Sequence, residues 1–248
     1  MAEKKEDWFA SWFDTTYYHI LYGERDYTEA EWFISNLVNY LKPSSKANFL
    51  DLACGRGRHA IYLNSKGFET AGVDLSSASI KVAHQSANET LHFDVHDMRK
   101  TYKKEAFDYV FNLFTSFGYF EDDTDNLKCI QAIANNLKPG GRLVMDFMNA
   151  KKVMLGLVAE EVKEAEGITF KINRSINSGH IIKQISFEDD EEPFHFEERV
   201  RALQLFDFQE LFQKSGLSIT DLFGDYELNP FNALVSDRLI LVAEKLNT

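Results

Sequence analysis

The sequence is poor in cysteine and in positive charge. Only two of its 248 residues are cysteines, and no secretory signal accompanies them, so free thiols in a reducing compartment are predicted rather than a disulfide. The 27 lysines and arginines are outnumbered by 39 acidic residues, which gives a net charge of −12. Nucleic-acid-binding surfaces usually carry a basic patch, so this balance argues against a nucleic-acid partner.

Long apolar runs are missing as well. No run approaches the ~18 residues that a membrane-spanning helix needs, so no membrane segment is predicted. Residues 1–7 are mostly charged and lack the apolar centre of a signal peptide. These absences predict a cytoplasmic protein without a membrane partner. Hydrophobic residues still make up 44% of the chain, which is enough for a sizeable core.

The most informative pattern runs over residues 48–77. An apolar run at residues 49–53 predicts a buried strand, and a glycine turn at residues 55–57 leads into a helix. A second apolar run, residues 69–73, ends on Asp74. A strand–turn–helix–strand unit with an acid at the end of its second strand is typical of a site that binds the ribose of a nucleoside.

The glycine turn by itself leaves two kinds of ligand open. Gly55, Gly57 and Ala60 match the G-x-G-x-x-G/A pattern of dinucleotide-binding proteins. However, Asp51 precedes the turn, where a pyrophosphate would meet a negative charge. Arg58 begins the helix, an unfavourable place for a cation unless an anion lies nearby. A ligand with one carboxylate, one cationic centre and no phosphate fits better, and S-adenosylmethionine has these features.

Several segments resemble those of class I S-adenosylmethionine-dependent methyltransferases. Leu50–Gly57 (LDLACGRG) resembles their first motif, Gly72–Ser76 (GVDLS) resembles their second, and Leu137–Gly141 (LKPGG) before an apolar strand is another family feature. Residues 111–119 (FNLFTSFGY) resemble the fourth-strand segment of sugar N-methyltransferases and other small-substrate relatives. The resemblance implies S-adenosyl-L-methionine as cofactor and a small-molecule acceptor, methylated by in-line displacement.

The resemblance also implies the cofactor-binding residues. Asp97 follows a predicted strand at residues 91–95, where the family's third motif binds the adenine amino group and the next residue, here Met98, packs on the ring. In relatives an N-terminal helix closes over the site, and Arg25 would pair with the methionine carboxylate. The cofactor-binding set predicted in this way is Tyr22, Arg25, Asp51, Ala53, Gly55, Gly57, Asp74, Leu75, Asp97, Met98 and Leu113.

No catalytic nucleophile is required, because positioning the two reactants supplies much of the rate. A base is useful only where the acceptor carries a proton at neutral pH, and the residue patterns do not choose among the candidates Tyr18, Tyr22, His19 and His195. His92 and His96 have no third ligand nearby at a suitable spacing, so no metal site is predicted.

The order of predicted elements indicates an α/β protein. We expect a Rossmann-like, seven-stranded, mostly parallel sheet with helices on both faces and a reversed last strand, because no helix separates the final two strands. Alternating residues at 168–201 predict about three antiparallel strands in an insert that overhangs the crevice and offers a surface for a homodimer. The predicted division is a helical lid at 1–45, a methyltransferase core at 46–150 and 203–248, and an inserted β subdomain at 151–202.

Two other functions stay open at this point. A nicotinamide-dependent oxidoreductase would use a similar fold, but Asp51, Asp97 and the reversed last strand argue against it. A non-catalytic module would bind the cofactor without turning over any acceptor.

Overall fold

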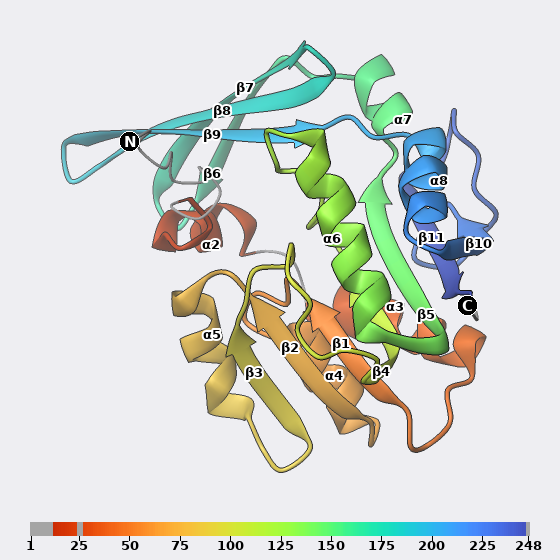
Figure 1. Cartoon of the computed structure of the whole chain (residues 1–248). Coiled ribbons are helices and arrows are strands. Elements are labelled where there is room, and N and C mark those ends of the chain that lie inside the picture. Colours follow the sequence, from red (N-terminus) through yellow and green to blue (C-terminus); the bar gives the residue numbers. More distant parts are fainter. Residues whose placement is uncertain (1–11, 24–26, 247–248) are drawn as a thin grey trace, which may run out of the picture.

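In the part of the chain that the computed structural model describes, residues 12–23 and 27–246, a seven-stranded sheet forms the centre (Figure 1). Its strands are β1 (Asn48–Leu52), β2 (Glu69–Asp74), β3 (Leu91–Val95), β4 (Phe107–Asn112), β5 (Leu137–Met148), β10 (Leu217–Phe223) and β11 (Arg238–Lys245). Their order is β10-β11-β5-β4-β1-β2-β3, and β11 runs antiparallel to both of its neighbours. The predicted sheet with one reversed strand is confirmed.

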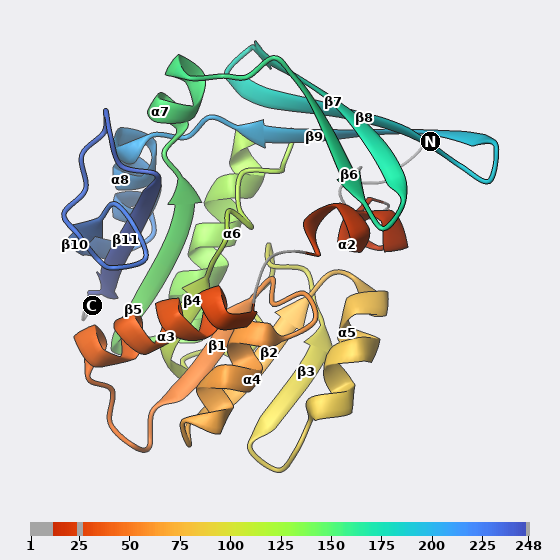
Figure 2. The same cartoon turned by 180° about the vertical axis from the view of Figure 1, so that it is seen from behind.

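Helices cover both faces of this sheet. Figures 1 and 2 show α6 (Asp123–Asn136) and α8 (Leu205–Lys214) on one face, with α3 (Tyr27–Leu41) and α4 (Arg58–Ser65) on the other. None of the helices among the described residues is long and apolar enough to cross a membrane. The remaining helices are α2 (Thr16–Tyr22), α5 (Ser77–Ala83), the short 3-10 helix η1 (His84–Ser86) and α7 (Ala150–Leu155).

Because helices cover both faces of the sheet, the central strands are apolar on both sides. In β1, Leu50 and Leu52 pack in the core beneath α6 and α8, whereas Phe49 packs in the core beneath α3 and α4. A strand buried on both faces has no reason to alternate with polar residues. Side chains mark the starts of two helices, because Ser76 accepts a hydrogen bond from the Ser79 amide at 3.0 Å and Asp122 accepts one from the Thr124 amide at 2.8 Å.

A separate antiparallel sheet lies near the carboxyl ends of the central strands (Figure 1). It contains β6 (Glu160–Ala165), β7 (Ile168–Asn177), β8 (His180–Asp189) and β9 (Glu192–Arg201), paired in that order. The expectation of about three strands was wrong by one. The missing strand is β6, an edge strand whose largely charged sequence (EEVKEA) shows little apolar alternation, as is usual for a protected sheet edge.

Helix α2 lies against this second sheet. Trp12 and Leu21 are buried in one apolar cluster with Phe170, Ile185 and Phe187 from β7 and β8. Both views place α2 between the second sheet and the ends of β1 and β2 (Figures 1 and 2). The apolar face of the second sheet is therefore covered by α2, and α2 in turn faces the central sheet.

Phe93 packs closely against the glycine turn. A Cβ atom added to Gly57 or to Gly72 would lie 2.6 Å from a ring carbon of Phe93, and at Gly72 it would also lie 3.0 Å from the Cys54 Sγ. Gly57 has a φ of +85°, which already favours glycine, whereas the restriction at Gly72 is steric. The ring of Phe93 thus joins β3 to the turn after β1.

Replacing Gly72 by alanine tests this packing. We expect Gly72→Ala to lower the free energy of unfolding by about 1–3 kcal/mol, because the added methyl group overpacks the space beside Phe93. Urea unfolding measures the change. The control is Gly156→Ala, where the nearest atom to an added Cβ is the Lys152 carbonyl oxygen at 3.6 Å. Equal stability of the two variants would contradict the close packing at Gly72.

Candidate functional site

A cavity of about 300 Å³ lies at the carboxyl ends of the parallel strands. Its wall includes Tyr22 from α2, Gly55 from the turn after β1, Asp74 from the end of β2 and Phe114 from the loop after β4. The volume is at the lower end of the range for small-molecule sites. Open α/β sheets bind their ligands at this edge, so the cavity is where a ligand is expected from the topology.

The turn after β1 presents bare backbone to the cavity. Ala53, Gly55 and Gly57 all have positive φ values, of 63°, 56° and 85°. A Cβ at Gly55 would meet no atom within 4 Å, so the space above this residue is open. Ala53 is not a glycine, and a left-handed backbone costs such a residue about 1–2 kcal/mol. A strained turn beside an open space is typical of a functional site.

Asp74 ties the end of β2 to this turn. Its Oδ2 accepts a hydrogen bond from the Gly55 amide, and its Oδ1 accepts one from the Ser76 amide, each at 2.8 Å. Burial raises the pKa of Asp74, while these amide bonds act in the opposite direction. Each carboxylate oxygen offers about two lone pairs, so both keep capacity for ligand hydroxyl groups.

Asp51 lies beneath the turn and does not line the cavity. It is 1% exposed, and its Oδ2 accepts a hydrogen bond from the Ala60 amide at 3.2 Å. Burial raises the pKa of Asp51 to about 7, and the nearby charge of Asp74 adds to this effect. The charge of Asp51 is therefore sensitive to any cation that binds above the turn.

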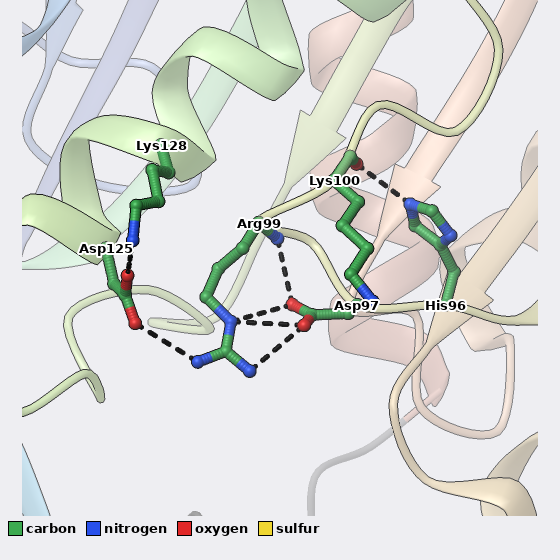
Figure 3. Close-up of polar contacts among 6 residues, drawn as sticks. All are labelled: His96, Asp97, Arg99, Lys100, Asp125 and Lys128. Atoms are coloured by element: carbon green, nitrogen blue, oxygen red, sulfur yellow. Dashed lines mark hydrogen bonds and ion pairs between the residues drawn. The ribbon is translucent and has the colours of Figure 1, made fainter.

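Asp97 lines the cavity and is held by an ion-pair network (Figure 3). The Arg99 guanidinium donates to both of its oxygens at 3.0–3.1 Å, and the Arg99 amide donates to Oδ1 at 3.0 Å. Arg99 also contacts Asp125 of α6 at 3.1 Å, and Lys128 pairs with the same carboxylate at 2.6 Å. Burial alone would raise the pKa of Asp97, but the bonds from Arg99 outweigh it and lower this pKa.

Another buried carboxylate supports the part of the cavity wall that the loop after β4 forms. Asp146 of β5 is fully buried, and its Oδ2 accepts a hydrogen bond from the Phe114 amide at 2.8 Å. Arg238 of β11 donates to Asp146 Oδ1 at 2.7 Å and to the Thr115 hydroxyl at 2.9 Å. Phe114 and Thr115 have φ values of 59° and 58°, a strained conformation that these bonds stabilise.

Three histidines line the cavity, His19, His59 and His96, and burial weakens the first two as bases. Burial lowers the pKa of His59 well below its usual value, and the neighbouring Arg58 lowers it further. Burial together with Arg56 lowers the pKa of His19 to about 4. The ring of Phe114 contacts both His59 and Arg58. Its centroid is 5.0 Å from that of the His59 ring and 4.3 Å from the Arg58 guanidinium carbon.

Most of the predicted residues meet at this cavity. Those that line it are Tyr18, Tyr22, Ala53, Gly55, Asp74, Leu75, Asp97, Met98 and Leu113. Asp51 and Gly57 are absent from the wall; Asp51 lies beneath the turn, and the would-be Cβ of Gly57 points at Phe93. Arg25 lies outside the described residues. His195 is exposed on β9, and the structure does not bring it to the cavity.

The cavity is covered by α2, as expected of an N-terminal helix, and not directly by the insert. No described residue of the second sheet lines it, whereas α2 contributes several side chains. The predicted overhang of the insert is therefore indirect. Local patterns gave no sign that His59 lines the cavity. They also gave no sign that Asp146 pairs with Arg238, because the two residues are 92 positions apart and share no motif.

Comparison with known proteins identifies a family. Residues 43–204 match the model of a methyltransferase domain. The chain is 26% identical over 210 residues to the dTDP-3-amino-3,4,6-trideoxy-alpha-D-glucopyranose N,N-dimethyltransferase of Streptomyces venezuelae, a match that covers 81% of this chain and 87% of that protein. It is 31% identical over 131 residues to the glycine/sarcosine N-methyltransferase of Aphanothece halophytica, covering 50% and 48%. The chain thus spans only about half the length of some curated relatives.

A solved structure shares the fold. A crystal structure of an S-adenosylmethionine-dependent methyltransferase from Clostridium acetobutylicum matches with a TM-score of 0.78 at 22% identity, covering 93% of this chain and 96% of that one. Because the family model covers well over half of the chain, the chain belongs to this family of S-adenosylmethionine-dependent methyltransferases. The predicted family and cofactor are confirmed. Among the described residues, no cluster of three or more histidine, cysteine or acidic side chains suits a metal ion.

Removing the Asp146 carboxylate tests the support of the cavity wall. We expect Asp146→Ala to lower the free energy of unfolding by about 3–5 kcal/mol, because Arg238 would keep a largely buried charge without its partner. Chemical denaturation measures the loss. The control is Asp237→Ala, since Asp237 pairs with Lys152 but its side chain is 78% exposed, so a change within about 1 kcal/mol is expected. A similarly small effect at Asp146 would contradict its role.

Proposed function

We propose that this protein transfers the methyl group of S-adenosylmethionine to the nitrogen of a small-molecule amine. The observation that carries the cofactor part is the pairing of an open backbone turn at Gly55 with the fixed carboxylate of Asp74. Asp74 would accept hydrogen bonds from the ribose hydroxyls, and the open turn lets the amino-acid part of the cofactor approach the backbone.

The other cavity residues fit the same cofactor. Asp97 is a hydrogen-bond acceptor that Arg99 holds in one orientation, which suits the amino group of adenine. Met98 and Leu75 are apolar neighbours in the wall and suit the faces of the adenine ring. Leu113 and Ala53 complete the apolar part of the wall. Asp51 would act from beneath the turn through its charge, without touching the ligand.

The methyl transfer requires no nucleophilic side chain from the protein. S-adenosylmethionine supplies a methyl group whose carbon bonds to the acceptor's lone pair as the carbon–sulfur bond breaks, and the acceptor's extra proton leaves to solvent. The cavity wall orients the reactants and excludes water, which lowers the entropic cost of the reaction. Tyr18 and Tyr22, which line the wall from α2, would contact the acceptor, whereas His195 is exposed on β9 and would not.

An amine acceptor agrees with the weak bases in the wall. With a pKa of about 4, His19 is a poor base for ionising a hydroxyl group, and burial weakens His59 as a base as well. An amine needs no such help, since its neutral fraction carries a free lone pair. A relative that matches over most of both chains is named an N,N-dimethyltransferase of an amino sugar nucleotide, which supports an acceptor of that kind.

We further propose the chain's division into a lid at 1–45, a core at 46–150 and 203–248, and an insert at 151–202. The contacts of residues 12–22 with β7 and β8 support a lid in that part, whereas α3 packs in the core beneath the central sheet. A cytoplasmic location, a homodimer through the insert and the absence of nucleic-acid and membrane partners stay predictions.

Acceptor pairs test the proposed reaction. The protein is incubated with S-adenosylmethionine labelled in its methyl group and with a sugar nucleotide that carries a primary amine, or with its hydroxyl counterpart. We expect the label on the amine, a mass gain of one methyl group and release of S-adenosylhomocysteine. Labelling of the hydroxyl compound alone would contradict an amine acceptor. Cofactor binding without transfer to any acceptor would favour a non-catalytic module.

Asp74→Asn tests the ribose contact. We expect binding of S-adenosylhomocysteine to weaken by about 1–3 kcal/mol, because charge-assisted hydrogen bonds to the ligand are lost while the side chain keeps its size. Titration calorimetry gives the affinity, and a melting curve shows whether the variant stays folded. Asp94→Asn on the adjacent strand, outside the cavity wall, serves as the control. Unchanged affinity at Asp74 would remove this residue from the site.

The raised pKa of Asp51 predicts a pH effect on cofactor binding. Below about pH 7 the carboxyl group is protonated and no longer attracts the ligand's ammonium group. Affinity for S-adenosylhomocysteine should therefore fall as the pH drops, by up to about tenfold between pH 8 and pH 6. The Asp51→Asn variant should bind weakly and without this pH dependence. The same pH slope in both proteins would assign the effect to another group.

A further inference from the structure

One largely buried carboxylate of the second sheet contacts the chain at two points around α2. Glu198 of β9 has a side chain that is 13% exposed. Its Oε1 accepts a hydrogen bond from the Trp12 indole nitrogen at 2.8 Å, and both of its oxygens lie 2.7–2.8 Å from the Tyr22 hydroxyl. Trp12 precedes α2 and Tyr22 is its last residue. A single side chain of the sheet therefore binds the chain on both sides of this helix.

A lysine completes the cluster. The Nζ of Lys183, on the neighbouring strand β8, contacts the Tyr22 hydroxyl and lies 3.8 Å from the Glu198 carboxylate and 4.5 Å from the centre of the Tyr22 ring. The Lys183 side chain is 15% exposed, so the surrounding water screens these charges only weakly. Hydrogen bonds in such a sheltered cluster reinforce one another.

Other contacts fix the orientation of the helix. Lys163 donates to the Leu21 carbonyl at 3.0 Å, near the end of α2 where unpaired carbonyl groups favour a cation. Tyr17 donates to Asp189 at 2.9 Å, and the rings of Trp12 and Phe196 lie 4.3 Å apart. The second sheet thus holds α2 by polar contacts along the helix as well as by the apolar cluster.

Tyr22 connects the cavity to the second sheet. It is one of the residues of the cavity wall, and its hydroxyl donates to Glu198 and contacts Lys183. Glu198 and Lys183 do not line the cavity themselves. This arrangement gives the second sheet a route to the site although none of its described residues reaches it.

We propose that Glu198 and Lys183 are positioning residues of the methyltransferase reaction, which act through Tyr22 by holding its ring and α2 over the bound cofactor. The inference rests on the proposed function. It makes the Tyr22 hydroxyl part of the attachment of α2 rather than the base of the reaction. It also gives the insert a role that depends on its apolar face and on Glu198, with the face that carries His195 turned to solvent.

The variants Tyr22→Phe and Glu198→Gln test the proposal, alone and together. Tyr22→Phe keeps the ring in the wall and removes only the hydroxyl. We expect each single variant to bind S-adenosylhomocysteine about five- to twentyfold more weakly and to release it faster in stopped-flow measurements, with a raised KM for the acceptor. The double variant should be no worse than the more affected single variant, because both changes break the same link.

Glu197→Gln is the matched control, since Glu197 is the adjacent residue on β9 and is exposed. It should bind and turn over like the unmodified protein. Additive effects of the two substitutions would overturn the proposal, as would unchanged affinity in both. A loss of kcat in Tyr22→Phe alone, with normal cofactor affinity, would assign the hydroxyl to the chemistry instead.

Two further readouts keep the test decisive. Melting curves identify a variant that fails to fold, and Tyr22→Phe then carries the test, because Glu198 retains Trp12 and Lys183 as partners. Release of S-adenosylhomocysteine is measured without an acceptor. Absent methyl transfer in the unmodified protein would therefore refute the proposed function while the cofactor-release data still decide the role of Glu198.

Discussion

The bond between a carboxylate and a backbone amide is the interaction on which the site depends. Asp74 accepts hydrogen bonds from Gly55 and Ser76, and so joins the glycine turn to the end of β2 and the start of α5. Asp51 does the same for the start of α4, and Asp146 for the loop after β4. Such bonds satisfy amides that have no partner in a helix or sheet, and they leave negative charge in fixed places.

These charges also define what the cavity binds. The carboxylates of Asp74 and Asp97 face a space whose other walls are largely apolar and aromatic. Burial raises the pKa of Asp74, whereas Arg99 keeps that of Asp97 low, so the two carboxyl groups in the wall differ in acidity. The site thus uses carboxylates to hold its own backbone and to present hydrogen-bond acceptors to the cavity.

The second sheet contributes support rather than a wall. Its apolar face packs on α2, and the helix presents Tyr18 and Tyr22 to the cavity. Because the link passes through a few buried polar contacts, a change on β8 or β9 reaches the site only if it alters the position of α2. Residues of β8 and β9 therefore shape the cavity through α2, whereas the residues of the cavity wall are the ones that can touch a ligand.

Local patterns were enough to predict the unit of β1, α4 and β2, because its strand, glycine turn and acid are adjacent in sequence and turn chemistry is local. They also placed Asp97 at a strand end and the reversed last strand. The patterns missed β6, whose charges hide the alternation, and the alternation of β9 did not tell which of its faces met the body. Tyr22 and Glu198 are 176 positions apart, and Asp146 and Arg238 are 92 apart. By itself the sequence determined the fold class, the cofactor and the glycine–aspartate centre of the site. Only the tertiary structure decided which distant charges are buried together, which helix covers the cavity and which face of the insert is hidden, because these follow from packing between segments that share no local pattern.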